Sequence, residues 1–369
     1  MKSHLTPPQR VPGLDLARGL ALLGMLFVNF DLVVSGLPGG PPLLVQALEG
    51  LQGRAAATFV VLAGVGGSLG ARRGWGDPAA RRLARARLLR RGALLLAGGT
   101  LFLTVWPADI LHYYGVWLAL GAGLVFAPAP AIGAAAVLAT LGGVAFSATG
   151  RFLEPWNLWT LEYRGLWEPA GFARNLLLDG FHPVLPWFAL YAAGLLLGRA
   201  ALTERATRMR LAALGAAGVA VSWTLALLLP GDGTLAAHLA TPRSFPPTPN
   251  FVLMGASAAT LVIVASISVA ERFPRATAPV ANVGRLALTL YVAHVIVGMG
   301  TLEELGLLGG QSRAFATWSA LAFFAGSVAC AAVWLRFFRA GPFEALLRAV
   351  GPRAPAADVS PRARPSRRS

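Results

Sequence analysis

Ten long apolar runs divide this chain, and they constrain its fold more than any other feature of the sequence. A bilayer core about 30 Å thick is crossed by roughly 20 apolar residues of helix, so runs of this length predict membrane-spanning helices. Backbone polar groups must be satisfied internally in lipid, which favours helices over open strands. We expect spans over Leu14–Ser35, Ala55–Gly70, Gly92–Trp106, Ile110–Ala127, Ile132–Ala148, Pro183–Gly198, Leu211–Leu229, Phe251–Ala270, Leu286–Thr301 and Ala314–Leu335.

The composition agrees with a membrane protein and argues against other classes. Hydrophobic residues make up 56% of the chain and charged residues 13%, with a net charge of +16. The arginines lie in short clusters between apolar runs rather than on a polar domain, so we expect no nucleic-acid partner. The single cysteine, Cys330, lies inside an apolar run. It cannot support a disulfide framework or a cysteine-ligated metal site, and we expect no metal.

The charges between the runs predict the orientation. Cytoplasmic loops of membrane proteins collect Lys and Arg. If the N-terminus is cytoplasmic, 26 of the 32 Lys and Arg fall on the inner side, and ten of the 16 acids fall outside. The sequence therefore predicts an all-α integral membrane protein with about ten transmembrane helices and both termini in the cytoplasm.

One membrane domain accounts for almost the whole chain. We expect residues 1–350 to form a polytopic transmembrane domain whose partner is the lipid bilayer. Residues 351–369 are rich in Pro and Arg and predict a disordered basic cytoplasmic tail. Whether the protein forms a homo-oligomer is left open.

Ionisable residues inside a span are costly, and each is a functional candidate. In the first run, Asp15 and Arg18 are spaced so that they share one helix face. They can form an ion pair that fixes the helix, or Arg18 can bind an anion. Asn29 and Asp31 lie at the other, outer end of the run, where a carboxylate can be hydrated.

Three histidines fall in the outer half of the membrane. His112 follows Asp109 by three residues, so the carboxylate can orient the imidazole as the partner of a general base, or it can only cap the helix. His182 lies at the start of its run, between Phe181 and Pro183. It can take part in the site, or it can be an ordinary interfacial histidine. His294 lies deep in the ninth run and needs a partner, either Tyr291 or a residue of another helix.

The outer loop between Ala148 and Phe181 mixes aromatic residues with charges of both signs. Such a surface can stack on a sugar ring, and an interfacial aromatic belt explains it equally well. The sequence contains no phosphate-binding loop and no H-E-x-x-H motif, so nucleotide hydrolysis and zinc proteolysis have no support.

Several segments together resemble a known family. The segment from Arg10 to Asn29 is similar to the R-x-x-x-L-D-x-x-R-G…M-x-x-V-N opening of the heparan-alpha-glucosaminide N-acetyltransferase-like membrane proteins and their bacterial relatives. The resemblance continues along nearly the whole chain. It includes Thr58–Gly66, Asp109–His112, His182-Pro183, Pro186-Trp187, Gly198-Arg199, Gly284-Arg285, Leu288-Thr289, Tyr291 and Gly341–Glu344.

The resemblance implies a transmembrane acyltransferase. Such an enzyme takes an acyl group, in the first place acetyl, from cytoplasmic acyl-CoA and passes it to an acceptor outside, such as a glycan or another envelope component. The family has a catalytic histidine shortly after the position of Asn29, but residues 30–54 contain none. We therefore expect His112, oriented by Asp109, to act as the base.

The remaining candidates complete this hypothesis. Asn29 and His294 are expected to assist catalysis, and Arg18 is expected to bind the acyl-CoA donor. Acceptor binding is assigned to Asp31, His182 and Tyr291. The alternative is a transporter or a non-enzymatic membrane protein whose polar residues line a solute path. A carrier usually needs ionisable groups through the depth of the bilayer, whereas these gather in the outer half.

Overall fold

The computed structural model describes residues 11–35, 40–229 and 233–351. Helices dominate them, and one two-stranded antiparallel sheet pairs β1 with β2. The elements of the first half are α1 (Pro12–Val34), α2 (Pro42–Leu51), α3 (Arg54–Ala71), η1 (Arg72–Trp75), α4 (Pro78–Phe102), α5 (Leu111–Leu124), α6 (Ala129–Ser147), β1 (Trp156–Asn157), β2 (Glu162–Tyr163), α7 (Pro169–Arg174) and η2 (Asn175–Asp179). Those of the second half are α8 (Val184–Leu197), α9 (Arg205–Leu228), α10 (Leu235–Ala240), α11 (Pro249–Arg272), α12 (Pro274–Arg285), α13 (Ala287–Ala293), η3 (His294–Met299), α14 (Gly300–Glu304), α15 (Arg313–Phe337) and α16 (Pro342–Ala349).

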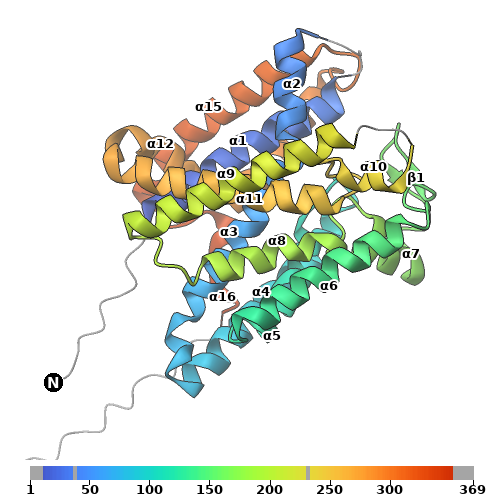
Figure 1. Ribbon diagram of the computed structural model, residues 1–369. Coiled ribbons are helices and arrows are strands. Elements are labelled where there is room, and N and C mark those ends of the chain that lie inside the picture. Colours follow the sequence, from blue (N-terminus) through green and yellow to red (C-terminus); the bar gives the residue numbers. More distant parts are fainter. Residues whose placement is uncertain (1–10, 36–39, 230–232, 352–369) are drawn as a thin grey trace, which may run out of the picture.

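Helix α1 lies at the centre of the bundle (Figure 1). It packs against α3, α11, α12 and α15, while α8 joins α3 to α6 and α4 pairs with α5. Close backbone approach allows the crossing of α3 and α8: a Cβ on Gly64 would lie 2.2 Å from the carbonyl oxygen of Tyr191. Small residues at helix contacts are how membrane helices pack without a hydrophobic driving force between them.

The described helices are those of a multi-pass membrane protein. Six segments are long and apolar enough to cross a bilayer, and the number rises to eight if each of two bent pairs, Pro169–Asp179 with Val184–Leu197 and Pro274–Arg285 with Ala287–Glu304, forms one span. Helices α6, α9 and α15 bury few of their residues inside the bundle, as helices that face lipid do.

The expected count of ten spans is not reached by this measure. Helix α4 runs unbroken from the basic segment at Pro78 through the apolar run that starts at Gly92, so its charges lower its apolar character. Helix α5 has only 14 residues. The run from Leu286 to Thr301 is not one regular helix, because it divides into α13, η3 and α14. The expected tail, 351–369, lies outside the described residues except for Gly351.

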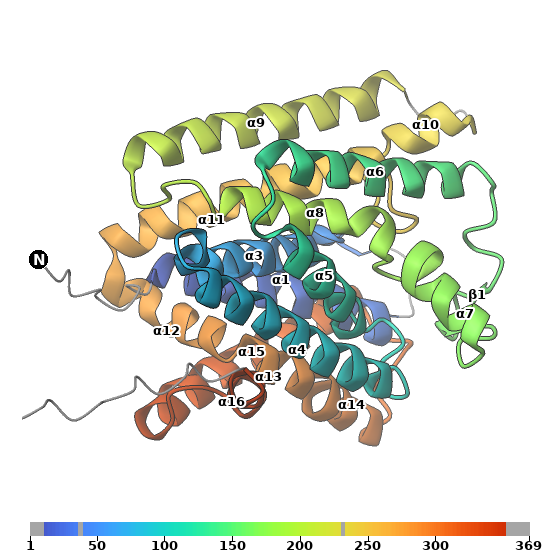
Figure 2. The same ribbon diagram turned by 90° about the horizontal axis from the view of Figure 1, so that it is seen from below.

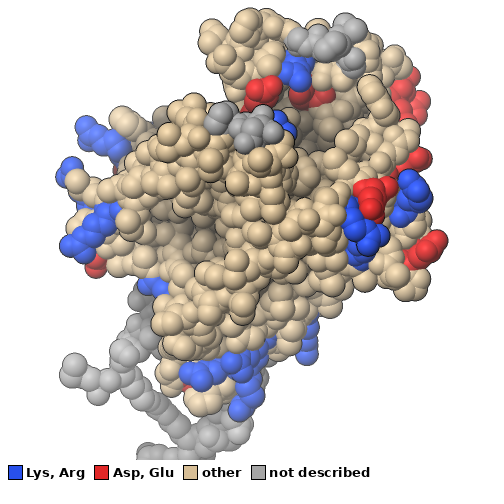
Figure 3. All heavy atoms as spheres, turned by 45° about the vertical axis from the view of Figure 1, so that its right-hand side comes forward, with Lys and Arg blue, Asp and Glu red and all other residues tan. Residues whose placement is uncertain are grey.

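Charges are distributed unevenly over the surface (Figure 3). A broad belt in the view is almost free of charged side chains, with Lys and Arg at the left and lower edges. Asp and Glu lie mainly at the top and the right, with arginines among them. Helix α16 lies at the end of the bundle opposite α7 and β1 (Figure 2).

Candidate active site

Asp109 and His112 form a buried pair at the start of α5. Asp109 lies in the turn between α4 and α5, where its N–H donates to the carbonyl of Trp106 at 3.0 Å. Its Oδ2 accepts the backbone N–H of His112 at 3.2 Å and Nδ1 of the same residue at 3.0 Å. Both residues have no exposed surface. The carboxylate therefore caps the helix and orients the imidazole at the same time.

The other nitrogen of His112 is left available. A carboxylate offers only acceptors, so Nδ1 carries the proton that is donated to Asp109, and Nε2 presents a lone pair. Nε2 is buried and has no hydrogen-bond partner among the described residues. Buried polar atoms are rarely left unpaired, so this nitrogen is a candidate for contact with a ligand. An imidazole held this way can accept a proton from a substrate.

Tyr291 binds the second oxygen of the same carboxylate. Its hydroxyl donates to Asp109 Oδ1 at 3.2 Å and accepts the backbone N–H of Ile110 at 3.3 Å. Tyr291 lies in α13, so this contact joins the C-terminal third of the chain to the start of α5. Both carboxylate oxygens of Asp109 are thus occupied, which fixes its orientation.

His294 and Asn29 form a second bonded pair. Nδ1 of His294 is hydrogen-bonded to the backbone carbonyl of Tyr291, which places the proton on Nδ1. Nε2 then accepts the Asn29 amide N–H at 3.0 Å. The two alternatives expected for His294 both hold, because Tyr291 contributes its carbonyl and α1 contributes Asn29. With both nitrogens bonded, His294 supports Asn29 and is not free to act as a base.

A cavity of about 620 Å³ leads toward these residues. It lies between α1, α3, α4, α5, α13 and α16, and Tyr291, Ile110 and Tyr114 are part of its wall. Asp109 and His112 do not line the cavity themselves, but Tyr291 binds Asp109, so the pair lies directly behind this wall. The charged residues of the lining are five arginines and two acids, namely Arg18, Arg87, Arg91, Arg285, Arg348, Asp15 and Glu344.

Arg18 pairs with Asp15, as the spacing of the two residues predicts, and donates to it at 2.7 Å. It also lines the cavity. Its side chain is 31% exposed, against 7% for that of Asp15. Arg18 therefore keeps a surface from which a ligand can be bound.

The basic run from Pro78 to Arg91, which includes Arg87 and Arg91, is explained by positive-inside retention or by binding of a phosphate-bearing cytoplasmic ligand, and Glu344 belongs to a segment that resembles the family, whereas the sequence gives no signal for Arg348. Arg87 and Arg91 are spaced to share one face of α4, a signal that was available. Their convergence with α16 was not, because it joins segments more than 250 residues apart: Arg91 Nε donates to the carbonyl of Leu347 at 3.2 Å across 256 residues.

Of the expected acceptor-binding residues, Asp31 lies away from this network, whereas His182 lies close enough to His112 for their charges to interact. Asp31 accepts the hydroxyl of Ser35 at 2.9 Å and lies 3.6 Å from the Arg313 guanidinium, at the far end of α1. His182 packs against the ring of Trp187, with centroids 4.7 Å apart, and its Nδ1 is buried without a hydrogen-bond partner in the described part of the chain. Tyr291, in contrast, belongs to the network itself.

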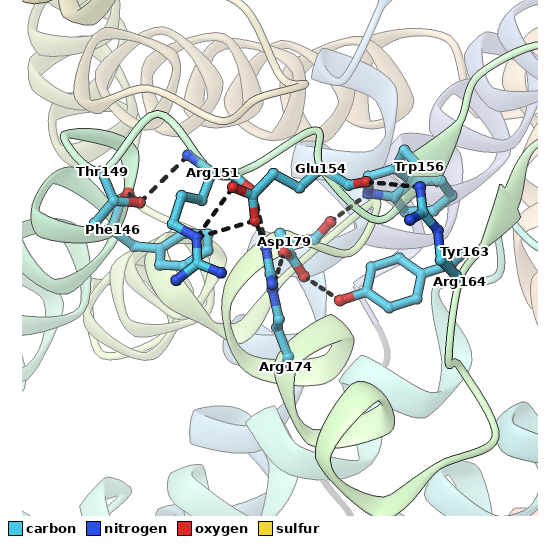
Figure 4. A network of polar contacts seen from close by, with 9 residues as sticks. All are labelled: Phe146, Thr149, Arg151, Glu154, Trp156, Tyr163, Arg164, Arg174 and Asp179. Atoms are coloured by element: carbon cyan, nitrogen blue, oxygen red, sulfur yellow. Dashed lines mark hydrogen bonds and ion pairs between the residues drawn. The ribbon is translucent and has the colours of Figure 1, made fainter.

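The loop between α6 and α8 is held by a polar cluster around Asp179 (Figure 4). The carboxylate accepts the Tyr163 hydroxyl at 2.7 Å and Arg174 Nε at 2.6 Å. The Asp179 carbonyl accepts the Trp156 indole N–H at 2.6 Å, and Glu154 lies 3.5 Å from Arg174. Burial, together with the bond to Asp179, raises the pKa of the Tyr163 hydroxyl above its ordinary value, so Tyr163 stays protonated as the donor. These contacts place the loop beside the turn that carries His182.

The fold defines the class of the protein: a predominantly helical, multi-pass membrane protein. The chain belongs to the family described as heparan-alpha-glucosaminide N-acetyltransferase, catalytic, whose model matches residues 10–240. Membership indicates membrane acetyltransferase activity in general and the use of acetyl-CoA in general.

A second family model, described as a protein of unknown function (DUF418), matches residues 196–351. No curated protein matches the chain. The candidate site draws on both regions. Asn29, Asp109 and His112 lie in the first, whereas Tyr291 and His294 lie in the second.

Proposed function

We propose that the protein transfers an acyl group, acetyl in the simplest case, from acyl-CoA to a hydroxyl or amine of an acceptor on the outer face, such as a glycan or another envelope component. The observation that carries the proposal is the cavity whose mouth is rich in arginine and whose wall includes Tyr291, the partner of the Asp109–His112 pair.

The cavity suits the donor in size and charge. Small-molecule sites commonly enclose roughly 300–1,000 Å³, and this one measures about 620 Å³. Arginine is the preferred side chain for phosphate, because its planar donors match phosphate oxygens. Arg18 would bind a phosphate of the CoA, and the apolar part of the lining, including Leu88, Leu95 and Leu118, would enclose the pantetheine arm.

His112 supplies the base in this scheme. Its Nε2 takes the proton of the acceptor as the acceptor oxygen or nitrogen attacks the thioester carbonyl. The carbon–sulfur bond then breaks, and CoA leaves as a thiolate that takes up a proton. Asp109 stabilises the imidazolium that forms and keeps it in the productive orientation.

Asn29 would stabilise the oxyanion. It lies one helical turn beyond Met25, which lines the cavity. One N–H of its amide is bound to His294, and the second would donate to the developing charge. Acceptor binding is assigned to the outer side, where His182 presents its unpaired Nδ1 and Asp31 its carboxylate.

The orientation follows from charge. We place both termini in the cytoplasm and the 148–181 loop outside, supported by the 26 of 32 cationic residues that this arrangement puts on the inner side. The cavity mouth, with Arg87 and Arg91, is then open to cytoplasmic acyl-CoA.

The proposal is tested on purified protein in nanodiscs. Acetyl-CoA should raise the melting temperature, and label should pass from radioactive acetyl-CoA to at least one member of a panel of amino sugars, glycans and envelope lipids. Stabilisation by a free solute, with uptake into vesicles and no binding of CoA, would support a transporter instead and overturn the proposal.

A further inference from the structure

Three arginines of the cavity lining lie close to one another. Arg87 and Arg91 come from α4, and Arg348 comes from α16. They lie close enough that the charges of Arg87 and Arg348 act on Arg91. Like charges gathered in this way destabilise a fold unless an anion lies between them.

No carboxylate neutralises the three in the described part of the chain, where none of them forms an ion pair. The nearby acid, Glu344, is committed elsewhere. It accepts the backbone N–H groups of Leu288 and Thr289 at 2.7 and 3.1 Å and the Thr289 hydroxyl at 2.6 Å. The cluster therefore keeps its positive charge.

Helix α16 has no buried residues, and hydrogen bonds attach it to the elements that surround the cavity. On one side Glu344 caps the first turn of α13. On the other side Arg91 donates to the carbonyl of Leu347. These two contacts bring Arg348, one residue further on, toward the face of α4 that carries Arg87.

The cavity wall includes both buried and exposed residues. Tyr291, which binds Asp109, is buried, whereas Arg348 of α16 is exposed. An acyl-CoA whose thioester lies toward Tyr291 would place its remote end toward α16. In acyl-CoA the pyrophosphate lies between the pantetheine arm and the adenosine, and the 3′-phosphate monoester lies at the end remote from the thioester.

We propose that Arg87, Arg91 and Arg348 form a subsite for the 3′-phosphate monoester of CoA, so that the protein distinguishes CoA from 3′-dephospho-CoA. The inference rests on the proposed function. It gives α16 a role in donor recognition, and it assigns this role to a segment outside the region matched by the acetyltransferase family model. The chemistry recognised is a phosphate monoester, which a lipid such as phosphatidate also carries.

The test compares the binding of CoA and 3′-dephospho-CoA by calorimetry in nanodiscs of phosphatidylcholine alone. The parent should bind CoA about tenfold more tightly, the value of one charge-assisted phosphate contact. Arg348→Gln and Arg87→Gln should abolish most of this preference and leave 3′-dephospho-CoA binding nearly unchanged. Arg90→Gln is the matched control, since Arg90 is an exposed arginine of α4 outside the cavity lining.

The outcomes separate the two proposals. Equal binding of CoA and 3′-dephospho-CoA by the parent would overturn the subsite and leave the proposed function standing. Failure of the parent to bind either would overturn the proposed function. A second set of nanodiscs contains phosphatidate: if Arg348→Gln changes phosphatidate binding and leaves the preference for CoA intact, the site recognises lipid and the inference is wrong.

Discussion

Tyr291 and Asp109 are 182 residues apart in the chain, and the hydroxyl of the first donates to the carboxylate of the second at 3.2 Å. The other oxygen of the same carboxylate accepts His112. One buried group thus connects a residue of the cavity wall to the imidazole that has a free nitrogen.

Changing His112 to Gln should lower the rate of acyl transfer by at least about a hundredfold, because the proton acceptor is lost. Asp109→Asn should have an effect of similar size, since it removes the charge that orients the imidazole and stabilises its cation. Acetyl-CoA binding, followed by calorimetry, should be retained in both. His238→Gln in α10 serves as the control. A His112 variant with the parental rate would exclude this residue as the base.

Tyr291→Phe isolates one hydroxyl while keeping the ring in the cavity wall. It leaves Ile110 N–H and one oxygen of Asp109 without their partner, so the free energy of unfolding should fall by about 1–3 kcal/mol. Turnover should fall while the affinity for acetyl-CoA stays close to parental. Denaturant unfolding and steady-state kinetics measure the two effects. An unchanged turnover number would show that Tyr291 does not act through Asp109.

Substitutions at Asp15 and Arg18 separate pairing from ligand binding. Arg18→Gln should destabilise the protein, and the double variant Asp15→Asn, Arg18→Gln should recover part of that loss, because it also removes the buried negative charge that Arg18 neutralises. If Arg18 binds a CoA phosphate, the double variant should bind acetyl-CoA about tenfold more weakly. A stable double variant with parental affinity would assign Arg18 to the ion pair alone.

Alanine substitutions at two neighbouring glycines of α4 should change the stability of the protein in opposite directions. A Cβ on Gly99 would lie 2.2 Å from the backbone nitrogen of His112, so Gly99→Ala should push the start of α5 away and cost about 1–3 kcal/mol. Gly98 has no neighbouring atom within 4 Å, and Gly98→Ala should stabilise the helix by up to about 1 kcal/mol. Melting temperatures of the two variants, together with their activities, check the pair.

The topology is tested independently of any activity. A reporter that is active only in the cytoplasm should be active when it is fused after Gly351 and inactive when it is fused near Glu162. The inverse pattern would reverse the orientation inferred from the charges and place the cavity mouth outside.

The long spans could be predicted because apolar character is a local property: α1, α3, α11 and α15 follow their runs within a few residues. A basic helix from Pro78 to Arg91 could be predicted, but hydropathy does not show that it continues into the run from Gly92, because the arginine charges end the apolar character while the helix goes on. The interruption of the helix after Arg285 has no sequence signal that we recognise.

The same distinction applies to the site. Asp109 and His112 are three residues apart, so their contact follows from the geometry of one turn. The bond between Asn29 and His294 spans 265 residues and depends on how α1 packs in the bundle. The arginine cluster at the cavity mouth likewise depends on packing, because α16 is placed by contacts to α4 and α13.

The cap that Glu344 provides has a consequence for how the protein is made. Leu288, whose N–H it accepts, leaves the ribosome 56 residues earlier than Glu344 does. Until then the first turn of α13 lacks this acceptor, and Tyr291 and His294 belong to a helix whose start is unfinished. The site therefore reaches its final arrangement only after α16 has been made, when the helices that surround it have already been inserted.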